Sequence, residues 1–134
     1  MTVEEMVQDA RTRNSGLSKE HVEAELTSGD DVLLVDVRDV RERWQNGTIP
    51  GSKNVPRGML EFWADPSSEY YKPFLKPDRR TILFCAGGKR SALAVDALMR
   101  LGYTNVTDLN VGFDAWRTEG GAVADVPIPD EYRR

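Results

Sequence analysis

The sequence predicts a three-layer α/β fold, with a central parallel sheet flanked by helices on both faces. Two observations predict it. Strand-like segments at 32–37, 81–84 and 106–109 alternate along the chain with helical patterns. The first of these segments is apolar from Val32 to Val35, as expected of a strand that is buried on both faces. A length of 134 residues is enough for one domain with a real core.

Two helices are expected before the first strand. In the segment 2–13, Thr2 and Glu5 have the spacing of a capping box. The apolar residues of this segment fall on one helical face: Val3, Met6, Val7 and Ala10. A second helix is expected to begin after Ser18, its N-cap, and to run to about Thr27.

Alternating elements are expected through the rest of the chain. The expected strands are 32–37, 54–55, 81–84 and 106–109. The expected helices are a short one carrying Val40 and Trp44, then 57–64, 90–101 and 112–118. Prolines make 65–79 mostly loop. We expect three parts: an N-terminal helical extension at 1–16, the main domain at 17–122 and a C-terminal tail at 123–134.

Composition excludes several classes of function. A net charge of −4 provides no general attraction to nucleic acid or to an anionic membrane. No apolar run is long enough to span a bilayer, and the acidic start of the chain does not resemble a signal peptide. One cysteine and one histidine cannot form an intrachain disulfide or a Cys/His metal site. We therefore expect a cytoplasmic protein with no metal and no cofactor.

The cysteine lies where a parallel α/β sheet usually binds ligands, at the carboxyl end of a strand. Cys85 follows the run 81–84 and precedes Gly87, Gly88 and a helix that opens with Lys89-Arg90. A glycine-rich turn and a helix N-terminus both present N–H groups to an anion. These groups and the two cations favour thiolate over thiol, whereas a free thiol is only about 3% ionised at pH 7.

The same segment has other interpretations. A lone cysteine after a strand is often a small buried hydrophobic residue, and Gly87-Gly88 could be an ordinary turn. A nucleotide P-loop is excluded, because Leu83 and Arg90 stand where that motif requires glycine and Ser or Thr. A Cys–His pair would need His21, which falls on an expected surface helix.

Four segments together resemble the rhodanese family of single-domain sulfurtransferases, over roughly residues 18–122. They are Asp36-Val37-Arg38 with Glu42 and Trp44, the turn Gly47 to Ser52, the loop Cys85 to Arg90, and Val106 to Trp116 with Gly121. Two positions depart from the family pattern. Thr48 stands in place of the usual histidine, and Val111 replaces the first glycine of a usual pair.

The resemblance implies that Cys85 is a nucleophile, which takes a sulfane sulfur from a donor such as thiosulfate and passes it to cyanide or a thiol. It implies that backbone N–H groups of the loop hold the persulfide. These groups belong to the segment from Ala86 to Ser91, which includes Gly87 and Gly88. Arg90, together with Lys89, would bind an anionic donor. Asp36, Arg38 and Glu42 would form a supporting charge network. A protein that accepts the sulfur is a further candidate partner.

Two other functions remain open alongside the sulfurtransferase. Related phosphatases and arsenate reductases resemble this fold, but they have five residues between cysteine and arginine, whereas Cys85 and Arg90 are separated by four. A non-catalytic rhodanese-like binding module is the second alternative, although such modules often lack the cysteine. A persulfide carrier in a pathway would use the same loop as the enzyme.

Overall fold

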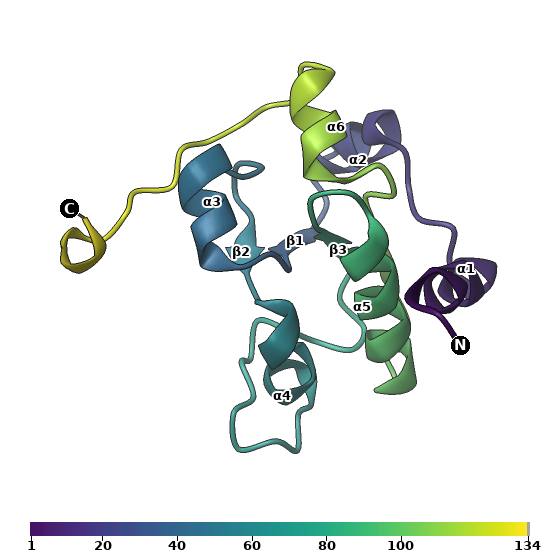
Figure 1. The fold of residues 1–134 in the computed structure, drawn as a ribbon. Helices are drawn as coiled ribbons and strands as arrows, with labels where there is room; N and C mark the ends of the chain where they lie inside the picture. Colours follow the sequence, from purple (N-terminus) through teal and green to yellow (C-terminus); the bar gives the residue numbers. More distant parts are fainter. Residues whose placement is uncertain (134) are drawn as a thin grey trace.

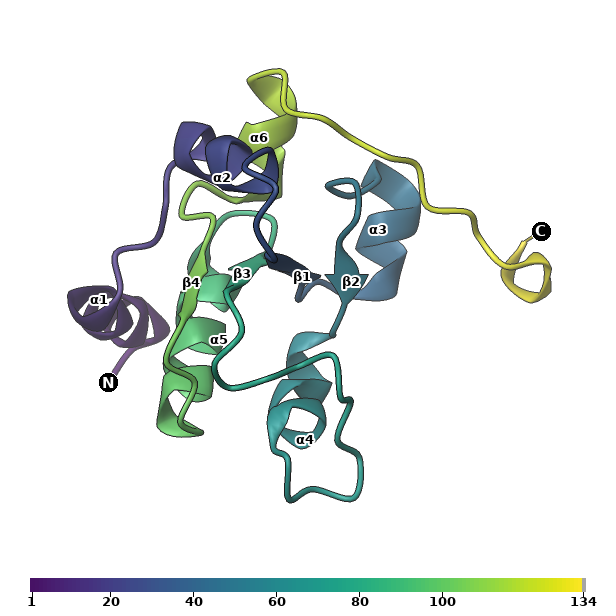
Figure 2. The same ribbon diagram turned by 180° about the vertical axis from the view of Figure 1, so that it is seen from behind.

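The computed structural model describes residues 1–133, and its centre is a four-stranded parallel sheet. The strands are β1 (Leu33–Asp36), β2 (Lys53–Asn54), β3 (Thr81–Phe84) and β4 (Val106–Asp108), in the spatial order β2-β1-β3-β4. β1 and β3 pair along their whole length, and β4 pairs with β3 on the side away from β1. The sheet therefore places the carboxyl ends of β1, β3 and β4 side by side (Figure 2).

Helices cover both faces of the sheet, which confirms the expected three layers (Figure 1). The helices are α1 (Val3–Arg13), α2 (Lys19–Leu26), α3 (Val40–Asn46), α4 (Leu60–Ala64), α5 (Lys89–Arg100) and α6 (Gly112–Thr118). Two short 3-10 turns, Arg57–Met59 and Asp130–Tyr132, complete the described elements. Among residues 1–133, no helix is long and apolar enough to cross a membrane.

Side-chain alternation along the strands divides the core in two. Leu33 and Val35 of β1 pack into one cluster, with residues of α4 and α5. Leu34 lies in the other cluster, with Val22 of α2 and Phe113 of α6. Because β1 and β3 are buried on both faces, the segments 33–35 and 82–84 are apolar without alternation, as the sequence predicts.

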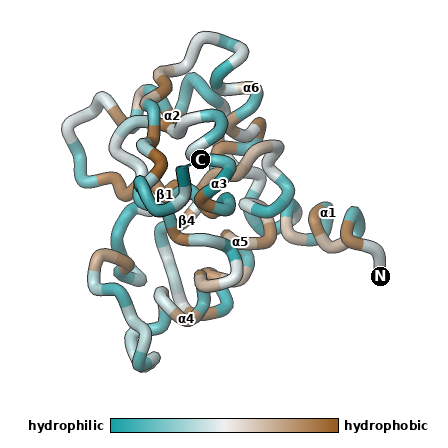
Figure 3. The backbone as a smooth tube through the Cα atoms, turned by 60° about the vertical axis from the view of Figure 1, so that its left-hand side comes forward, coloured by the Kyte–Doolittle hydropathy of each residue, from teal (hydrophilic) through white to brown (hydrophobic). Residues whose placement is uncertain are grey.

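The N-terminal helix differs from expectation in how it packs. Thr2 caps it as predicted, but Val3 and Met6 of its apolar face are exposed, and only Ala10 is buried. The helix lies beside α5 at the edge of the molecule, and in Figure 3 it projects to one side. Charged contacts to α5 and β4 hold it there, which a search for apolar periodicity does not detect.

Small shifts separate the expected and observed boundaries elsewhere. β2 covers Lys53–Asn54 instead of 54–55, and α5 begins at Lys89 instead of at residue 90. The chain after α6 is held at two points: Ala124 pairs with Thr48, and the Tyr132 ring lies 5.4 Å from that of Trp44. Position 134 of the expected tail lies outside the described residues, and the three-part division of the chain stays a prediction.

Candidate active site

The Cys85 side chain lies at the base of the loop that joins β3 to α5, and it is fully buried. Its Sγ accepts hydrogen bonds from the backbone N–H groups of Gly88 at 3.1 Å and Ser91 at 3.3 Å. Ser91 Oγ lies 3.6 Å from Sγ. Within residues 1–133, no other N–H of the loop is hydrogen-bonded to the sulfur. The sulfur therefore sits where two backbone donors and the N-terminus of α5 stabilise negative charge.

Two glycines and one helix end determine the shape of this loop. Gly88 has φ +94°, a left-handed conformation that L side chains rarely adopt. Gly112 has φ +80°, and a Cβ there would lie 2.3 Å from the carbonyl oxygen of Ala86. That close approach lets the N–H of Phe113 bond to the carbonyl of Cys85 at 2.8 Å. The start of α6 thus holds the cysteine loop in place.

Arg90 and Lys89 both engage carboxylates in this structure. Arg90, at the start of α5, donates to both oxygens of Glu42, and this pairing raises the pKa of Arg90 above its ordinary value. A thiolate at Cys85 would act on the pKa of Arg90 in the same direction, to a smaller extent. Lys89 is largely exposed and forms an ion pair with Glu4 of α1.

The three residues expected to support the site divide between two networks. Asp36 and Arg38 are buried and joined by two side-chain hydrogen bonds, of 3.0 and 2.8 Å, and Arg43 also donates to Asp36. Glu42 instead holds Arg90. Thr48, which stands in place of the family's histidine, donates its hydroxyl to Asp36 at 2.9 Å and so joins the first network.

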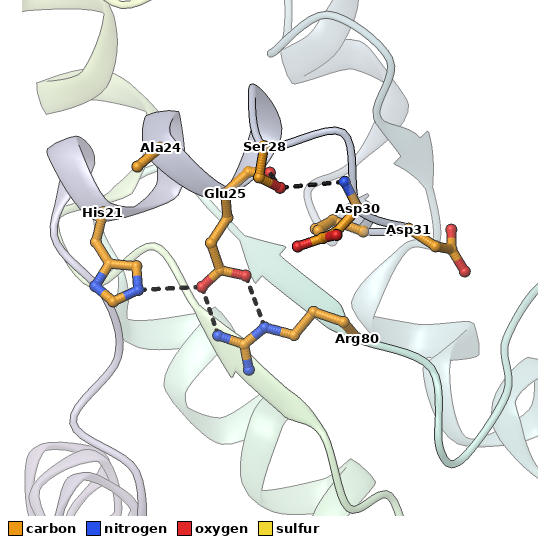
Figure 4. A pocket seen from close by; sticks show the side chains of 8 residues that line it. His21, Ala24, Glu25, Ser28, Asp30, Asp31 and Arg80 are labelled. Atoms are coloured by element: carbon orange, nitrogen blue, oxygen red, sulfur yellow. Dashed lines mark hydrogen bonds and ion pairs between the residues drawn. The ribbon is translucent and has the colours of Figure 1, made fainter.

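His21 lies in a separate pocket, shown in Figure 4, where His21 and Arg80 both reach Glu25. The Arg80 pair lowers the pKa of Glu25 below its ordinary value. Because Arg80 precedes β3 and Cys85 follows it, this pocket and the cysteine lie at opposite ends of the strand. Among residues 1–133, no group of His, Cys, Asp and Glu side chains could hold a metal ion.

Two residues near the cysteine loop were missed by the sequence analysis. Asp108, the last residue of β4, is fully buried and accepts a 2.6 Å hydrogen bond from Ser91 Oγ. Arg11 of α1 pairs with that carboxylate from outside the sheet. A charged residue at the end of a strand beside the cysteine strand was the available signal for Asp108. No local pattern points to Arg11.

Comparisons with known proteins identify the family of this chain. The model of the Rhodanese-like domain matches residues 18–119. A "Sulfurtransferase" from Allochromatium vinosum is 34% identical over 78% of this chain and 89% of its own length. Human thiosulfate:glutathione sulfurtransferase is 37% identical, over 62% of this chain and 76% of its own.

Among solved structures, one similar protein comes from Rhodopseudomonas palustris and is described as of unknown function and a possible tyrosine phosphatase. Its TM-score is 0.87 and its identity 38%, over 92% of this chain and 95% of that one. The domain match spans the strands, the cysteine loop and the helices that position it. The chain therefore belongs to the family of rhodanese-like domains.

Proposed function

We propose that this protein is a sulfurtransferase that carries a sulfane sulfur on Cys85, with thiosulfate as a donor. The observation that carries the proposal is the position of Sγ. It is held by the N–H groups of Gly88 and Ser91, in a loop with four residues between the cysteine and Arg90. Sulfurtransferase names among the relatives support the reaction class.

The proposed reaction has two displacements at sulfur. In the first, the Cys85 thiolate attacks the outer sulfur of thiosulfate. The sulfur–sulfur bond of thiosulfate breaks, and sulfite leaves with the bonding electron pair. In the second, cyanide or a thiolate attacks the outer sulfur of the Cys85 persulfide. The bond from that sulfur to Sγ breaks, so the Cys85 thiolate is restored and thiocyanate or a new persulfide leaves.

The residues of the loop have separate parts in this scheme. The N–H groups of Gly88 and Ser91 stabilise the anionic sulfur before and after transfer. Arg90 carries its positive charge close to the sulfur and is partly exposed, so it can attract the sulfonate end of the donor. Lys89 contributes only longer-range attraction, because it is exposed and already paired with Glu4.

Location and partners complete the proposal. Because the only cysteine must remain a thiol, a reducing cytoplasm is the compartment that suits it. Small anionic donors and thiol acceptors are the proposed partners, and a protein acceptor would dock over the same loop. The name of the human relative includes glutathione, which makes glutathione the first thiol acceptor to assay.

Mass spectrometry tests the proposal directly. After incubation with thiosulfate, the peptide that contains Cys85 should gain one sulfur, about 32 Da, and dithiothreitol should remove it. The Cys85→Ser protein should gain nothing and should not form thiocyanate from cyanide. Undiminished sulfur transfer by Cys85→Ser would refute the proposal.

A further inference from the structure

A chain of polar contacts connects the N-terminal helix to the cysteine. It starts at Arg11 of α1, which lies outside the residues matched by the family model. Arg11 Nη1 donates to Asp108 Oδ1 at 2.6 Å, and Nη2 donates to Oδ2 at 2.9 Å. Nη2 also donates to the carbonyl oxygen of Gly88 at 3.0 Å. One guanidinium is thus hydrogen-bonded both to the end of β4 and to the cysteine loop.

Ser91 links this pair to the sulfur. Its Oγ donates to Asp108 Oδ2 at 2.6 Å, and its backbone N–H donates to Cys85 Sγ. A hydroxyl has one proton, and the bond to Asp108 is shorter than the 3.2 Å contact of the same Oγ with the carbonyl oxygen of Gly88, so we place the proton of Ser91 toward Asp108. The Cys85 thiol is then a donor to Ser91 Oγ, at 3.6 Å. Asp108 therefore governs the polar surroundings of the sulfur without touching it.

The charge of Asp108 would oppose a thiolate at Cys85. Asp108 is fully buried, and only Ser91 lies between its carboxylate and Sγ in this chain of contacts. A negative charge at that place, in a medium of low dielectric constant, disfavours a second one nearby. Arg11 supplies the balancing positive charge, through a side chain that is itself 23% exposed.

We propose that Arg11 is a positioning residue of the active site: it neutralises Asp108 and fixes the loop at Gly88, so that Cys85 can carry an anionic sulfur. The inference rests on the proposed function, and it makes α1 part of the site instead of a separate extension. At Gly88, which has a left-handed conformation, the carbonyl accepts from Arg11 and the N–H donates to the sulfur.

The experiment measures the rate at which iodoacetamide alkylates Cys85, the only thiol in the chain. Arg11→Ala should slow alkylation about tenfold, because the unbalanced carboxylate lowers the thiolate population. Arg11→Lys should recover part of the rate, since it restores the charge but not the forked geometry. In the double variant Arg11→Ala/Asp108→Asn, Cys85 should be alkylated faster than in Arg11→Ala. The second substitution removes the opposing charge, and its side-chain oxygen can still accept the hydrogen bond from Ser91.

Arg13→Ala is the matched control. Arg13 lies on the same helix and pairs at the surface with Asp96 of α5, at 2.7 Å. Cys85 of the Arg13→Ala protein should be alkylated at the wild-type rate. Thermal melts should show that every variant is folded. Equal rates for Arg11→Ala and wild type would overturn the proposal. The proposal would also be overturned if Cys85 of the double variant were alkylated as slowly as in Arg11→Ala. The same holds if Arg13→Ala lowered the alkylation rate as much as Arg11→Ala does.

The same variants are then assayed for persulfide formation with thiosulfate. Alkylation does not require sulfur transfer, so the two proposals fail separately. If Cys85→Ser still transfers sulfur, the proposed function is wrong, whereas the order of alkylation rates continues to decide the role of Arg11.

Discussion

Arg90 and Glu42 face each other across 48 residues of sequence and share two hydrogen bonds, of 2.8 and 3.0 Å. The pairing joins α5 to α3, at the side of the cysteine loop. The Arg90 guanidinium lowers the pKa of Glu42 below its ordinary value of 4.5. Arg90, the proposed donor-binding cation, is therefore held in position by Glu42.

The acid sensitivity of folding should report this pair. Because the pKa of Glu42 is lower in the folded state, its stabilisation is present above pH 4.5 and is lost as the pH falls through the folded value. Glu42→Gln should lower the free energy of unfolding by about 0.5–1 kcal/mol at neutral pH, the usual range for a partly exposed pair. Urea titrations should show the difference from wild type shrinking as the pH falls below 4.5. A difference that grows in acid would contradict this.

Gly88 and Gly87 are adjacent in the sequence, but their substitution by alanine should have unequal effects. At Gly88 a Cβ would lie 2.3 Å from the carbonyl oxygen of Asn110, and φ is positive. At Gly87 an added Cβ would meet no atom of residues 1–133 within 4 Å, apart from its chain neighbours. Gly88→Ala should cost at least about 1–2 kcal/mol of stability, and Gly87→Ala little. Chemical denaturation compares them, and equal costs would show that the turn is not constrained as described.

Removing Arg38 should destabilise the whole fold. Arg38 is buried, donates to Asp36 and to the Gly47 carbonyl, and its guanidinium carbon lies 4.4 Å from the centre of the Phe113 ring. Arg38→Met would leave Asp36 short of a partner in the interior, at a cost of about 3–5 kcal/mol. Arg41→Met, at an exposed neighbouring position, is the control. Similar melting temperatures for the two variants would contradict the prediction that Arg38 stabilises the fold.

The length of the cysteine loop should determine which substrates react. The unmodified protein, with four residues between Cys85 and Arg90, should show no appreciable turnover of aryl phosphates or arsenate. One glycine inserted after Gly88 should weaken sulfur transfer, because it displaces the Ser91 N–H from Sγ. Phosphatase and thiocyanate assays on both proteins make the comparison. Robust phosphatase turnover by the unmodified chain would favour the activity named for the R. palustris relative.

His21 should be dispensable for sulfur transfer. Its imidazole lies 3.2 Å from Glu25, at the opposite end of the sheet from the cysteine. His21→Ala should keep nearly the wild-type rate of thiocyanate formation from thiosulfate and cyanide, because the activating groups are those of the loop. Loss of activity in a folded His21→Ala protein would mean that a distant base takes part.

Elements with a strong local pattern were predicted well. The apolar runs of β1 and β3, the caps at Thr2 and Ser18 and the stripe of α5 each combine several local signals, and each was found within one or two residues. β2 was shifted by one residue, because its two residues carry almost no periodicity. Local chemistry therefore predicts where elements form better than where short ones end.

The site was predicted only in part, for a physical reason. The order of strand, Cys85, glycines and helix is local, so the candidate nucleophile and its loop could be proposed from the sequence. The pairing of Glu42 with Arg90, and of Arg11 with Asp108, depends on contacts between segments 48 and 97 residues apart. Such contacts follow from the packing of whole elements, and no spacing rule within one segment reports them.

The segment between α1 and α2 has a consequence for the behaviour of the protein in concentrated solution. Leu17 exchanges backbone hydrogen bonds with Asp108 and Asn110, and the Asn14 side chain bonds to the carbonyl of Val106. These contacts occupy the outer side of β4, which would otherwise offer unpaired groups to a strand of another molecule. Residues 14–17 thus cover the free edge of β4 and oppose edge-to-edge association. We expect a chain shortened to begin after them to aggregate more readily through β4.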